Sequence, residues 1–356
     1  MIIKKVSMKD VANELGVSVA LVSYVLNGKK TDKINAQTAA KIRSTALKMK
    51  YSPNQIAKSL KTSKTHTLGL IVADISNLFY SSIAKYIEEE ANLHGYHIIY
   101  GSAYEEPQRF NSILHLLLSR QVDGLILAIP EKAEDCIQQL TDMEQPFVIL
   151  DRKFYNYPKA PAILLDNFHA STTIVQHLID NGYKRLGVVT INRGLINLQE
   201  RKTGFEKTVF ELLKQQPFIY EVEEDDMENQ MQTLIPRAIS EDKVDCLCFF
   251  TNKVAMAALA KVAAMEIKVP DQLGIVCFDE AESYNLFRTP VTYFRQPLKE
   301  MSHAAIANLV AQMESKGAAN STVQVTSTMP IEFKGTLVVR ESSVRNAKIP
   351  RAPDIE

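Results

Sequence analysis

The sequence predicts an all-α helix-turn-helix headpiece followed by a two-lobed α/β core, in which each lobe is built on a doubly wound parallel sheet. Three observations support this fold class. The first 50 residues contain three short helical patterns, and a tight glycine turn separates the first two. From residue 66 onward, non-alternating apolar runs are separated by amphipathic helices, as is typical of parallel sheets covered on both faces. This alternation occurs twice in tandem, which indicates two lobes.

The headpiece helices have favourable caps and apolar faces. Ser7 is a good N-cap for the first helix, which Gly16 ends. Ser18 caps the second helix, predicted over 19–27, and a third is predicted over about 36–50. The side chains expected to face a shared core, at three- to four-residue spacing, are Val11, Ala12, Leu15, Val22, Val25, Leu26, Ile42, Ala46 and Met49.

A break and a polar linker follow the third helix. Ser52 precedes a proline and is therefore disfavoured in a helix. Pro53 suits the first position of a further short helix in PNQIAKSLK, and TSKT follows as a linker. The predicted domains are the headpiece (1–52), the hinge helix with its linker (53–65), and the core (66–356).

In the core, strands alternate with helices and the chain passes between the lobes three times. The predicted strands lie in TLGLIVAD, YHIIYGS, VDGLILAIP, PFVILD, KRLGVVT, VDCLCFF and LGIVCFD. The predicted helices span 80–94, 107–120, 132–142, 169–181, 200–214 and 253–265. The predicted crossings lie near 161–170, 288–298 and 325–333. These divide the core into lobe 1, about 66–163 and 296–326, and lobe 2, about 167–291 and 330–342. Ligands of such sheets bind beyond the carboxyl ends of the strands, here in the cleft between lobes.

Charge is distributed unevenly, although the formal net charge is zero. Residues 1–64 contain 13 Lys and Arg against 3 Asp and Glu, whereas the rest of the chain contains 28 against 38. A basic module joined to an acidic body indicates a polyanion partner such as nucleic acid. The alternative is a solvated basic face with no partner. We expect the acidic stretch EVEEDDMEN (221–229) to be solvated surface and not a metal site.

Cysteine spacing and hydropathy suggest a cytoplasmic protein. Cys246 and Cys248 are two apart, so they share one face of a strand and are expected to pack in the core. No apolar run approaches the roughly 20 residues of a membrane span, and the first residues lack signal-peptide features. We therefore expect the cytoplasm, with no membrane contact, no metal and no cofactor.

Motifs that match one known family occur from end to end. They are MKDVANELGVSVALVSYVLNGK, YSPNQIAKSLKT, LGLIVADISNLFY, SRQVDGLILA, VILDR, ERKTGF, TNKVAMAAL, GIVCFD, FRQP and LVVRESS. The N-terminal set is highly specific, and the later motifs gain specificity from their order and spacing. On these motifs the chain resembles the lac-repressor/purine-repressor (LacI/GalR) family of bacterial transcription regulators. The resemblance implies a DNA-binding headpiece, a hinge helix, a periplasmic-binding-protein-like core, and a homodimer or dimer of dimers.

The resemblance places helix 19–27 in the major groove, with Val19, Ala20 and Tyr24 at the base-reading positions. Position 24 is often arginine or histidine in the family. The Tyr24 hydroxyl can bind a base edge or a phosphate and its ring can cover a thymine methyl, but it cannot form arginine's bidentate contact with guanine. Alternatively, Tyr24 packs against the hinge or the third helix. The residues expected to hold phosphate or cap the helix are Ser18, Ser23 and Asn27.

The hinge carries a second set of expected DNA contacts. Leu60 matches the family leucine that wedges between central base pairs in the minor groove, and Ala57 lies on the same face. Lys58 replaces the family's usual arginine, which implies a weaker or differently placed minor-groove contact. The alternative, Leu60 packed on its own headpiece, applies to the DNA-free state.

The resemblance also implies that the cleft binds a sugar-like effector, because aromatic faces stack on sugar rings and planar charged groups hydrogen-bond hydroxyls. The expected effector contacts are Phe79, Tyr80, Asp151, Arg152, Arg201, Asn252 and Asp279. Asn252 and Lys253 stand where the family commonly has an aspartate, and Leu78 replaces a common proline. Because of these departures from the family pattern, the sequence does not identify the ligand. A structural role is the alternative for each residue; Asp279, for example, could cap the following turn.

The predicted function is therefore a repressor that binds an inverted-repeat operator in double-stranded DNA as a homodimer and responds to an effector, more commonly by induction. One alternative is control by a protein partner instead of a small molecule. Alternatives of another class are a soluble sugar-binding protein and an enzyme on the same core. Against an enzyme, the sequence lacks Gly-x-x-x-x-Gly-Lys-Ser/Thr, Gly-x-Ser-x-Gly, and Gly-x-Gly-x-x-Gly after the first strand. No catalytic residues are predicted.

Overall fold

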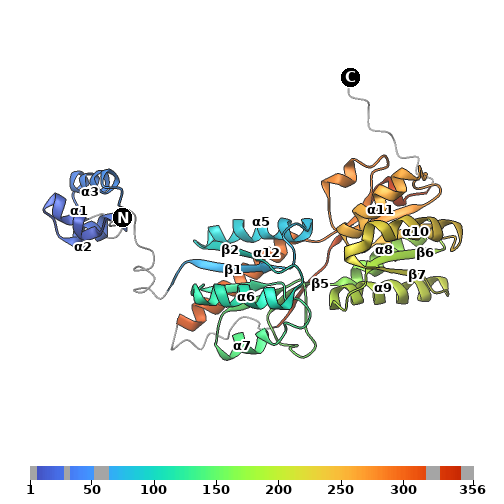
Figure 1. The fold of residues 1–356 in the computed structure, drawn as a ribbon, viewed down its shortest axis with the longest axis horizontal. Helices are drawn as coiled ribbons and strands as arrows, with labels where there is room; N and C mark the ends of the chain where they lie inside the picture. The colour runs from blue at the N-terminus through green and yellow to red at the C-terminus, as the bar shows by residue number, and fades with distance from the viewer. Residues whose placement is uncertain (1–5, 28–32, 52–63, 318–328, 346–356) are drawn as a thin grey trace, which may run out of the picture. The chain divides into compact units, whose positions relative to one another are not determined.

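The computed structural model describes residues 6–27, 33–51, 64–317 and 329–345. The chain forms two compact units, Met1–Thr65 and His66–Glu356 (Figure 1). Among the described residues, no helix has both the length and the apolar character that a membrane span requires.

The N-terminal unit contains three helices, α1 (Met8–Leu15), α2 (Val19–Leu26) and α3 (Ala36–Lys48). Ser7 and Asp10 form a capping box on α1, and Gly16 ends this helix with a left-handed φ of 65°. The predicted core is confirmed. Its buried members are Val11, Ala12, Val22, Val25, Ile42 and Ala46, while Leu15, Leu26 and Met49 pack against them partly buried.

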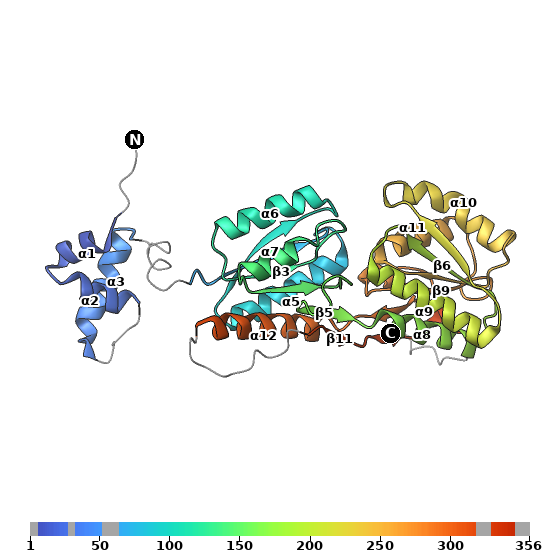
Figure 2. The ribbon, with the colours of Figure 1, turned by 90° about the horizontal axis from the view of Figure 1, so that it is seen from below.

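Lobe 1 of the core is a six-stranded, wholly parallel sheet with strand order β11-β5-β4-β3-β1-β2. Its strands are β1 (Thr67–Val72), β2 (His97–Ser102), β3 (Gly124–Leu127), β4 (Phe147–Leu150), β5 (Ala162–Leu165) and β11 (Ile331–Phe333). Helices α5 (Leu78–Leu93) and α12 (Leu298–Gly317) cover one face, and α6 (Pro107–Ser119) and α7 (Cys136–Asp142) cover the other (Figure 2).

Lobe 2 repeats this arrangement with strand order β12-β10-β9-β8-β6-β7. Its strands are β6 (Leu186–Ile191), β7 (Phe218–Val222), β8 (Cys246–Phe249), β9 (Gly274–Phe278), β10 (Thr292–Arg295) and β12 (Thr336–Val338). One face is covered by α8 (Asn167–Asp180) and α9 (Ile196–Leu213), and the other by α10 (Met227–Ser240) and α11 (Asn252–Ala264). Cys246 and Cys248 are buried on the α8 and α9 face, which confirms core packing for this pair.

The structure corrects two predictions about the sheets. Residues 331–333 were predicted in lobe 2, but β11 pairs in parallel with β5 of lobe 1. The third crossing therefore lies at Lys334–Gly335, and the first two lie at Asp166 and at Gln296–Pro297. In addition, the lobe 2 sheet is not wholly parallel, because the returning chain places β12 antiparallel to β10 at the edge.

The prediction of solvated surface over 221–229 holds for most of the stretch, in which Val222 and Met227 are buried, Glu224 is partly buried and the other six residues are exposed. The stretch contains the end of β7, the 3₁₀ turn η2 (Glu224–Asp226) and the start of α10. The carboxylates are also favoured at this position because they precede a helix N-terminus with its partial positive charge.

Close packing of α8 against α9 depends on Gly204. A Cβ added at this position would lie 2.8 Å from the carbonyl oxygen of Phe168 and 3.1 Å from its Cα. Both atoms belong to the α8 backbone, which cannot move aside without separating the helices.

We expect Gly204→Ala to lower the free energy of unfolding by about 1–2 kcal/mol, because overpacking outweighs the gain of roughly 1 kcal/mol in helix propensity. Urea unfolding of the full chain measures this. Glu211→Ala, on the exposed face of the same helix, is the control and should change stability little. Equal or greater stability of Gly204→Ala would contradict the packing argument.

Candidate functional site

In the headpiece, α2 presents an exposed surface that extends from its first turn to its last. Val19 and Tyr24 expose 44% and 37% of their area, and Ala20 is exposed beside them. Ala20 and Tyr24 are four residues apart and therefore share one face of the helix. The predicted base-reading residues are thus on the surface of the unit.

The polar residues at the ends of α2 cap the helix. The Ser18 hydroxyl accepts a hydrogen bond from the Leu21 amide at 3.2 Å. The Asn27 side-chain amide donates to the Ser23 carbonyl at 2.8 Å and to its hydroxyl at 3.2 Å. These contacts establish a capping function for Ser18 and Asn27, and phosphate binding by either remains a prediction. Ala57, Lys58 and Leu60 lie outside the described residues.

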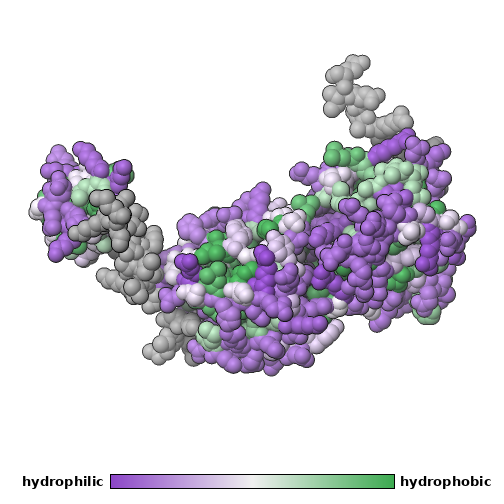
Figure 3. Space-filling model, viewed as in Figure 1, coloured by the Kyte–Doolittle hydropathy of each residue, from purple (hydrophilic) through white to green (hydrophobic). Residues whose placement is uncertain are grey.

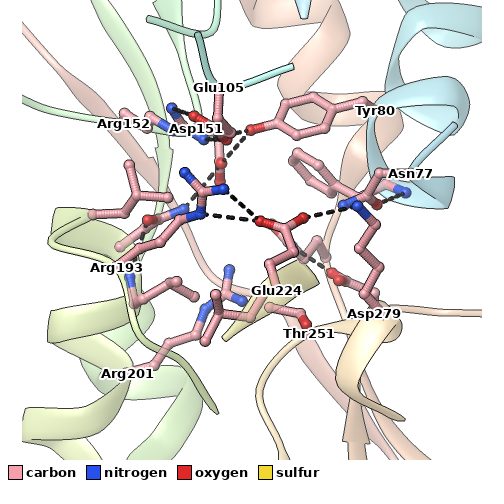
Figure 4. Close-up of a pocket in the computed structure, with 17 residues that line it drawn as sticks. Asn77, Tyr80, Glu105, Asp151, Arg152, Arg193, Arg201, Glu224, Thr251 and Asp279 are labelled. Carbon is pink, nitrogen blue, oxygen red and sulfur yellow. Dashed lines mark hydrogen bonds and ion pairs between the residues drawn. The ribbon is translucent and has the colours of Figure 1, made fainter. Parts of the chain in front are cut away.

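In the core, a cleft lies where the carboxyl ends of the strands of both lobes meet (Figure 4). Its cavity is small, about 70 Å³. Six of the seven predicted effector residues line it, namely Phe79, Tyr80, Asp151, Arg152, Arg201 and Asp279. The seventh, Asn252, does not line this cavity. Its side chain lies instead at the junction of the lobes, beside a larger groove between α10 and α11.

The lobe 1 wall of the cleft is a network around Arg152. The guanidinium forms two hydrogen bonds with the Glu105 carboxylate, one of them 2.9 Å long, and donates to the Ile129 carbonyl at 2.9 Å. It also donates at 3.2 Å to the Tyr80 hydroxyl, which donates at 3.2 Å to Asp151. Burial alone would lower the pKa of Arg152, but Tyr80 and Glu105 raise it above its ordinary value. Arg152 therefore stays charged in a buried position.

The lobe 2 wall is centred on Arg201. Its Nε donates to the Asn167 side chain at 2.8 Å, its Nη1 donates to the Phe250 carbonyl at 2.7 Å, and its guanidinium lies 3.7 Å from the centre of the Phe278 ring. Burial lowers the pKa of Arg201 and raises the pKa of Asp279. These groups are costly to bury, which is typical of residues retained for function.

Gln296, on the second crossing, is a cleft residue that the sequence analysis did not identify. Its Nε2 donates to Asp279 at 2.6 Å, whereas its Oε1 is buried without a hydrogen-bond partner among the described residues. The Nε of Arg152 is likewise buried and unpartnered within this part of the chain. An unpaired acceptor and donor in one cleft can be satisfied by a ligand that carries hydroxyl groups. The FRQP motif contained Gln296, but only the fold shows where it lies.

Four polar contacts join the lobes across the cleft. The Asn197 amide donates to Asp151 at 3.0 Å, and the Asn252 amide donates to Asn77 at 3.1 Å. The two ion pairs join Lys153 to Glu200 at 2.7 Å and Lys253 to Asp74 at 3.1 Å. These contacts connect the two walls of the cleft.

Glu224 is a second cleft residue that was missed, because it lies in the acidic stretch predicted to be solvated. It lines the cavity, and its carboxylate pairs with Arg193 at 2.8 Å and with Lys253 at 2.8 Å (Figure 4). Its neighbours Glu223, Asp225 and Asp226 are exposed. No group of three or more His, Cys, Asp or Glu side chains in the described residues could hold a metal ion.

Two family models match the chain. The one described as "Periplasmic binding proteins and sugar binding domain of LacI family" matches residues 65–332, and "Bacterial regulatory proteins, lacI family" matches residues 7–54. Among curated relatives, catabolite control protein A from Priestia megaterium is 29% identical over 90% of this chain and 96% of its own length. The HTH-type transcriptional repressor PurR from Actinobacillus pleuropneumoniae serotype 3 is 27% identical over 96% of this chain and 98% of its own.

Solved structures have the same fold. A lac repressor dimer bound to operator and the anti-inducer ONPF aligns with a TM-score of 0.81 at 19% identity, covering 96% of this chain and all of that one. The transcriptional regulator CelR in complex with cellobiose aligns with a TM-score of 0.68 at 20% identity, covering 95% of this chain and all of that one. These alignments confirm the predicted fold class, with sheets that are mostly parallel.

The Arg152 network leads to a stability prediction. Arg152→Met keeps the volume of the side chain but leaves the Glu105 carboxylate partly buried without its cation. Removing one partner of such a pair costs about 3 kcal/mol or more. Urea unfolding of the core should show this loss, and Arg120→Met, at the exposed end of α6, should show almost none. Equal losses in the two variants would mean that the network does not stabilise the fold.

Proposed function

Because this chain belongs to the lacI family of bacterial regulatory proteins, and is therefore a transcription regulator and not an enzyme, we propose that it represses genes by binding an operator, with an affinity set by a small effector in the cleft. The observation that carries the effector proposal is the pair of unpartnered buried groups, Gln296 Oε1 and Arg152 Nε, in a cleft lined from both lobes. We place the protein in the cytoplasm, where its DNA is.

In the proposed DNA complex, α2 enters the major groove with Val19, Ala20 and Tyr24 toward base edges. Their exposure on the surface of α2 supports this placement. Ser18, Ser23 and Asn27 hold phosphates in addition to capping the helix. In the hinge, Leu60 wedges into the minor groove, flanked by Ala57 and Lys58. The net charge of residues 1–64 supplies the sequence-independent attraction.

The proposed effector is uncharged and rich in hydroxyl groups, like a sugar. Arg152 pairs with Glu105 and Arg193 with Glu224, and Arg201 lines the same cavity as the carboxylates of Asp151 and Asp279. The charges of the lining therefore balance, and an additional charge would be left unpaired. Phe79 and Tyr80 offer aromatic faces for a ring. The groups proposed to hold hydroxyls are Asp151, Arg152, Arg201, Asp279 and Gln296. Asn252 acts at the lobe junction, and contacts an effector only if its bond to Asn77 opens.

Effector and DNA communicate through the lobe arrangement. Three crossings allow the lobes to close but restrict twisting, and an effector that contacts both lobes favours one arrangement. The hinge helix that the sequence predicts in PNQIAKSLK is shorter than the roughly 12–15 residues that an isolated helix needs, so we expect it to fold when two copies meet on DNA. A shift of lobe 1 changes their separation. A coupling of about 1–3 kcal/mol is expected, and we favour induction.

An inverted-repeat operator has two equal half-sites, one for each headpiece, so we propose that the chain binds as a homodimer. The edge strand β2 supports it, because Ile99 and Tyr100 are about 40% exposed there, and Figure 3 shows apolar side chains on this part of lobe 1. Exposed apolar edges of this kind are typical of interfaces.

The competing proposal is control by a protein partner. A thermal-shift screen of the protein against sugars, phosphosugars and nucleosides separates the two, since an effector at 100 times its Kd adds about 2.7 kcal/mol.

We expect Tyr24→Ala to relax the preference at one outer base pair of each half-site by about 1–3 kcal/mol, because a base-edge contact is lost. Binding to a set of single-base operator variants at fixed salt measures this. Tyr24→Phe removes only the hydroxyl group, so it separates the contribution of the hydroxyl to base preference from that of the ring. Equal weakening on all sequences would instead make Tyr24 a phosphate or packing residue.

We expect Leu60→Ala to lose specific DNA binding and keep effector binding, and Arg201→Ala to keep DNA binding and lose the effector response. Operator binding with and without the effector found by the screen measures both. Gln296→Met, which keeps the side-chain volume, tests the same cleft if Arg201→Ala is unstable. An unchanged response and effector affinity in both cleft variants would show that the effector binds elsewhere.

A further inference from the structure

Four charged side chains form a connected set at the cleft, here called the mouth cluster: Arg193, Glu224 and Lys253 from lobe 2, and Asp74 from lobe 1. Arg193 donates to Glu224 through Nε at 3.0 Å and Nη2 at 2.8 Å. Lys253 then contacts Glu224 at 2.8 Å and Asp74 at 3.1 Å. The Lys253 ammonium therefore connects a carboxylate of each lobe.

Lys253 occupies a position that local physics does not favour for a cation. It is the second residue of α11, in which Thr251 is the N-cap and Asn252 is the first residue. The N-terminus of a helix carries partial positive charge, so a carboxylate is favoured there and a lysine is not. The two carboxylates that flank Lys253 offset this repulsion, and one of them belongs to the other lobe.

Asp74 is held ready for this contact. Its Oδ1 accepts hydrogen bonds from the Ser76 amide at 2.9 Å and from the Ser76 hydroxyl at 2.7 Å, which leaves Oδ2 for Lys253. Burial raises the pKa of Asp74, but these hydrogen bonds and Lys253 outweigh it, so the pKa lies below its usual value. Burial also raises the pKa of Glu224, but Lys253 and Arg193 hold it below its usual value as well. The cluster is therefore fully charged at neutral pH.

We infer that Lys253 is a built-in closing contact, which holds the lobes together without an effector and determines which effectors can enter. The inference rests on the proposed function only in taking this cleft as the effector site. In a cleft without such a contact, closure waits for a ligand that joins the lobes. In this protein the group that joins the lobes is the Lys253 ammonium, which belongs to the chain itself. Its effective concentration at the contact is therefore high at all times. The neighbouring bond between Asn252 and Asn77 acts in the same direction.

Two consequences follow for effector binding. An effector gains less by closing the cleft, because the contact between Lys253 and Asp74 already joins the lobes. A ligand too large for the narrow cavity must first break the pair between Lys253 and Asp74, so Lys253 restricts the size of ligands that bind well. Lys253 is in this sense a specificity-determining residue.

The distance between the lobes in full-length protein tests this inference. Cysteines introduced at the exposed positions Gln108 of lobe 1 and Glu228 of lobe 2 carry spin labels, while the four native cysteines are buried. Pulsed electron paramagnetic resonance, without DNA or effector and diluted with unlabelled protein, gives the distance distribution. We expect one short distance in the parent chain. Lys253→Met and Asp74→Asn should each shift the open-to-closed ratio about two- to five-fold toward longer distances.

Two control variants make the result specific to this contact. Lys261→Met changes a lysine of the same helix whose ammonium donates to Gln232 of its own lobe at 2.7 Å, and it should leave the distance unchanged. Lys253→Arg keeps the charge and should keep the short distance. In 1 M KCl the parent chain should open at least as far as Lys253→Met does, because salt also screens the pair between Lys153 and Glu200.

Matching distributions for Lys253→Met, Lys261→Met and the parent chain would overturn the inference. The measurement needs neither operator nor sugar, so its outcome is separate from that of the proposed function. If no small molecule binds but Lys253→Met opens the lobes, the closing contact stands and the effector proposal fails. If effectors bind and Lys253→Met stays closed, the effector proposal stands and the closing contact fails.

Discussion

The cleft between the lobes depends on one electrostatic constraint: a charged side chain that is withdrawn from water needs an opposite charge or hydrogen-bonding groups close by. Burying an unmatched ion costs several kcal/mol, whereas a matched and hydrogen-bonded pair is tolerated. Arg152 is matched by Glu105 within lobe 1, and Arg193 by Glu224 within lobe 2. Lys253 is matched partly across the cleft by Asp74. The balance of charges therefore links the stability of each lobe to the position of the other.

This constraint explains why the site is built at the ends of strands. In each sheet, neighbouring parallel strands end at one edge, and the loops beyond them bring together side chains distant in sequence. Asp151 follows β4 and Asp279 follows β9, both with left-handed φ values, 69° and 65°. Such turns are costly for residues with a Cβ and are typical of functional positions. The strands position the charges, while the loops carry the conformational cost.

Local patterns in the sequence predicted much of the fold, because capping and apolar periodicity act over a few residues. Ser7, Gly16 and Ser18 bound their helices as expected, and six of seven predicted effector residues line one cavity. Predictions failed where long-range pairing decides. The position of β11 depends on its pairing with β5, some 168 residues earlier in register, and no local pattern shows this. Glu224 is acidic like its exposed neighbours, and only the fold directs it toward Arg193 and Lys253.

The three crossings and the cross-lobe contacts together set how the core can respond. The crossings at Asp166, Gln296–Pro297 and Lys334–Gly335 keep the lobes side by side whether or not the cleft is closed. The free-energy difference between arrangements is then small and lies in a few side-chain contacts, each of them modest at partly exposed positions. Gln296 lies on a crossing and also bonds Asp279 in the cleft. A ligand that pairs with its free oxygen therefore acts on the connection between the lobes itself, and a change of a few kcal/mol in the cleft is enough to shift the arrangement.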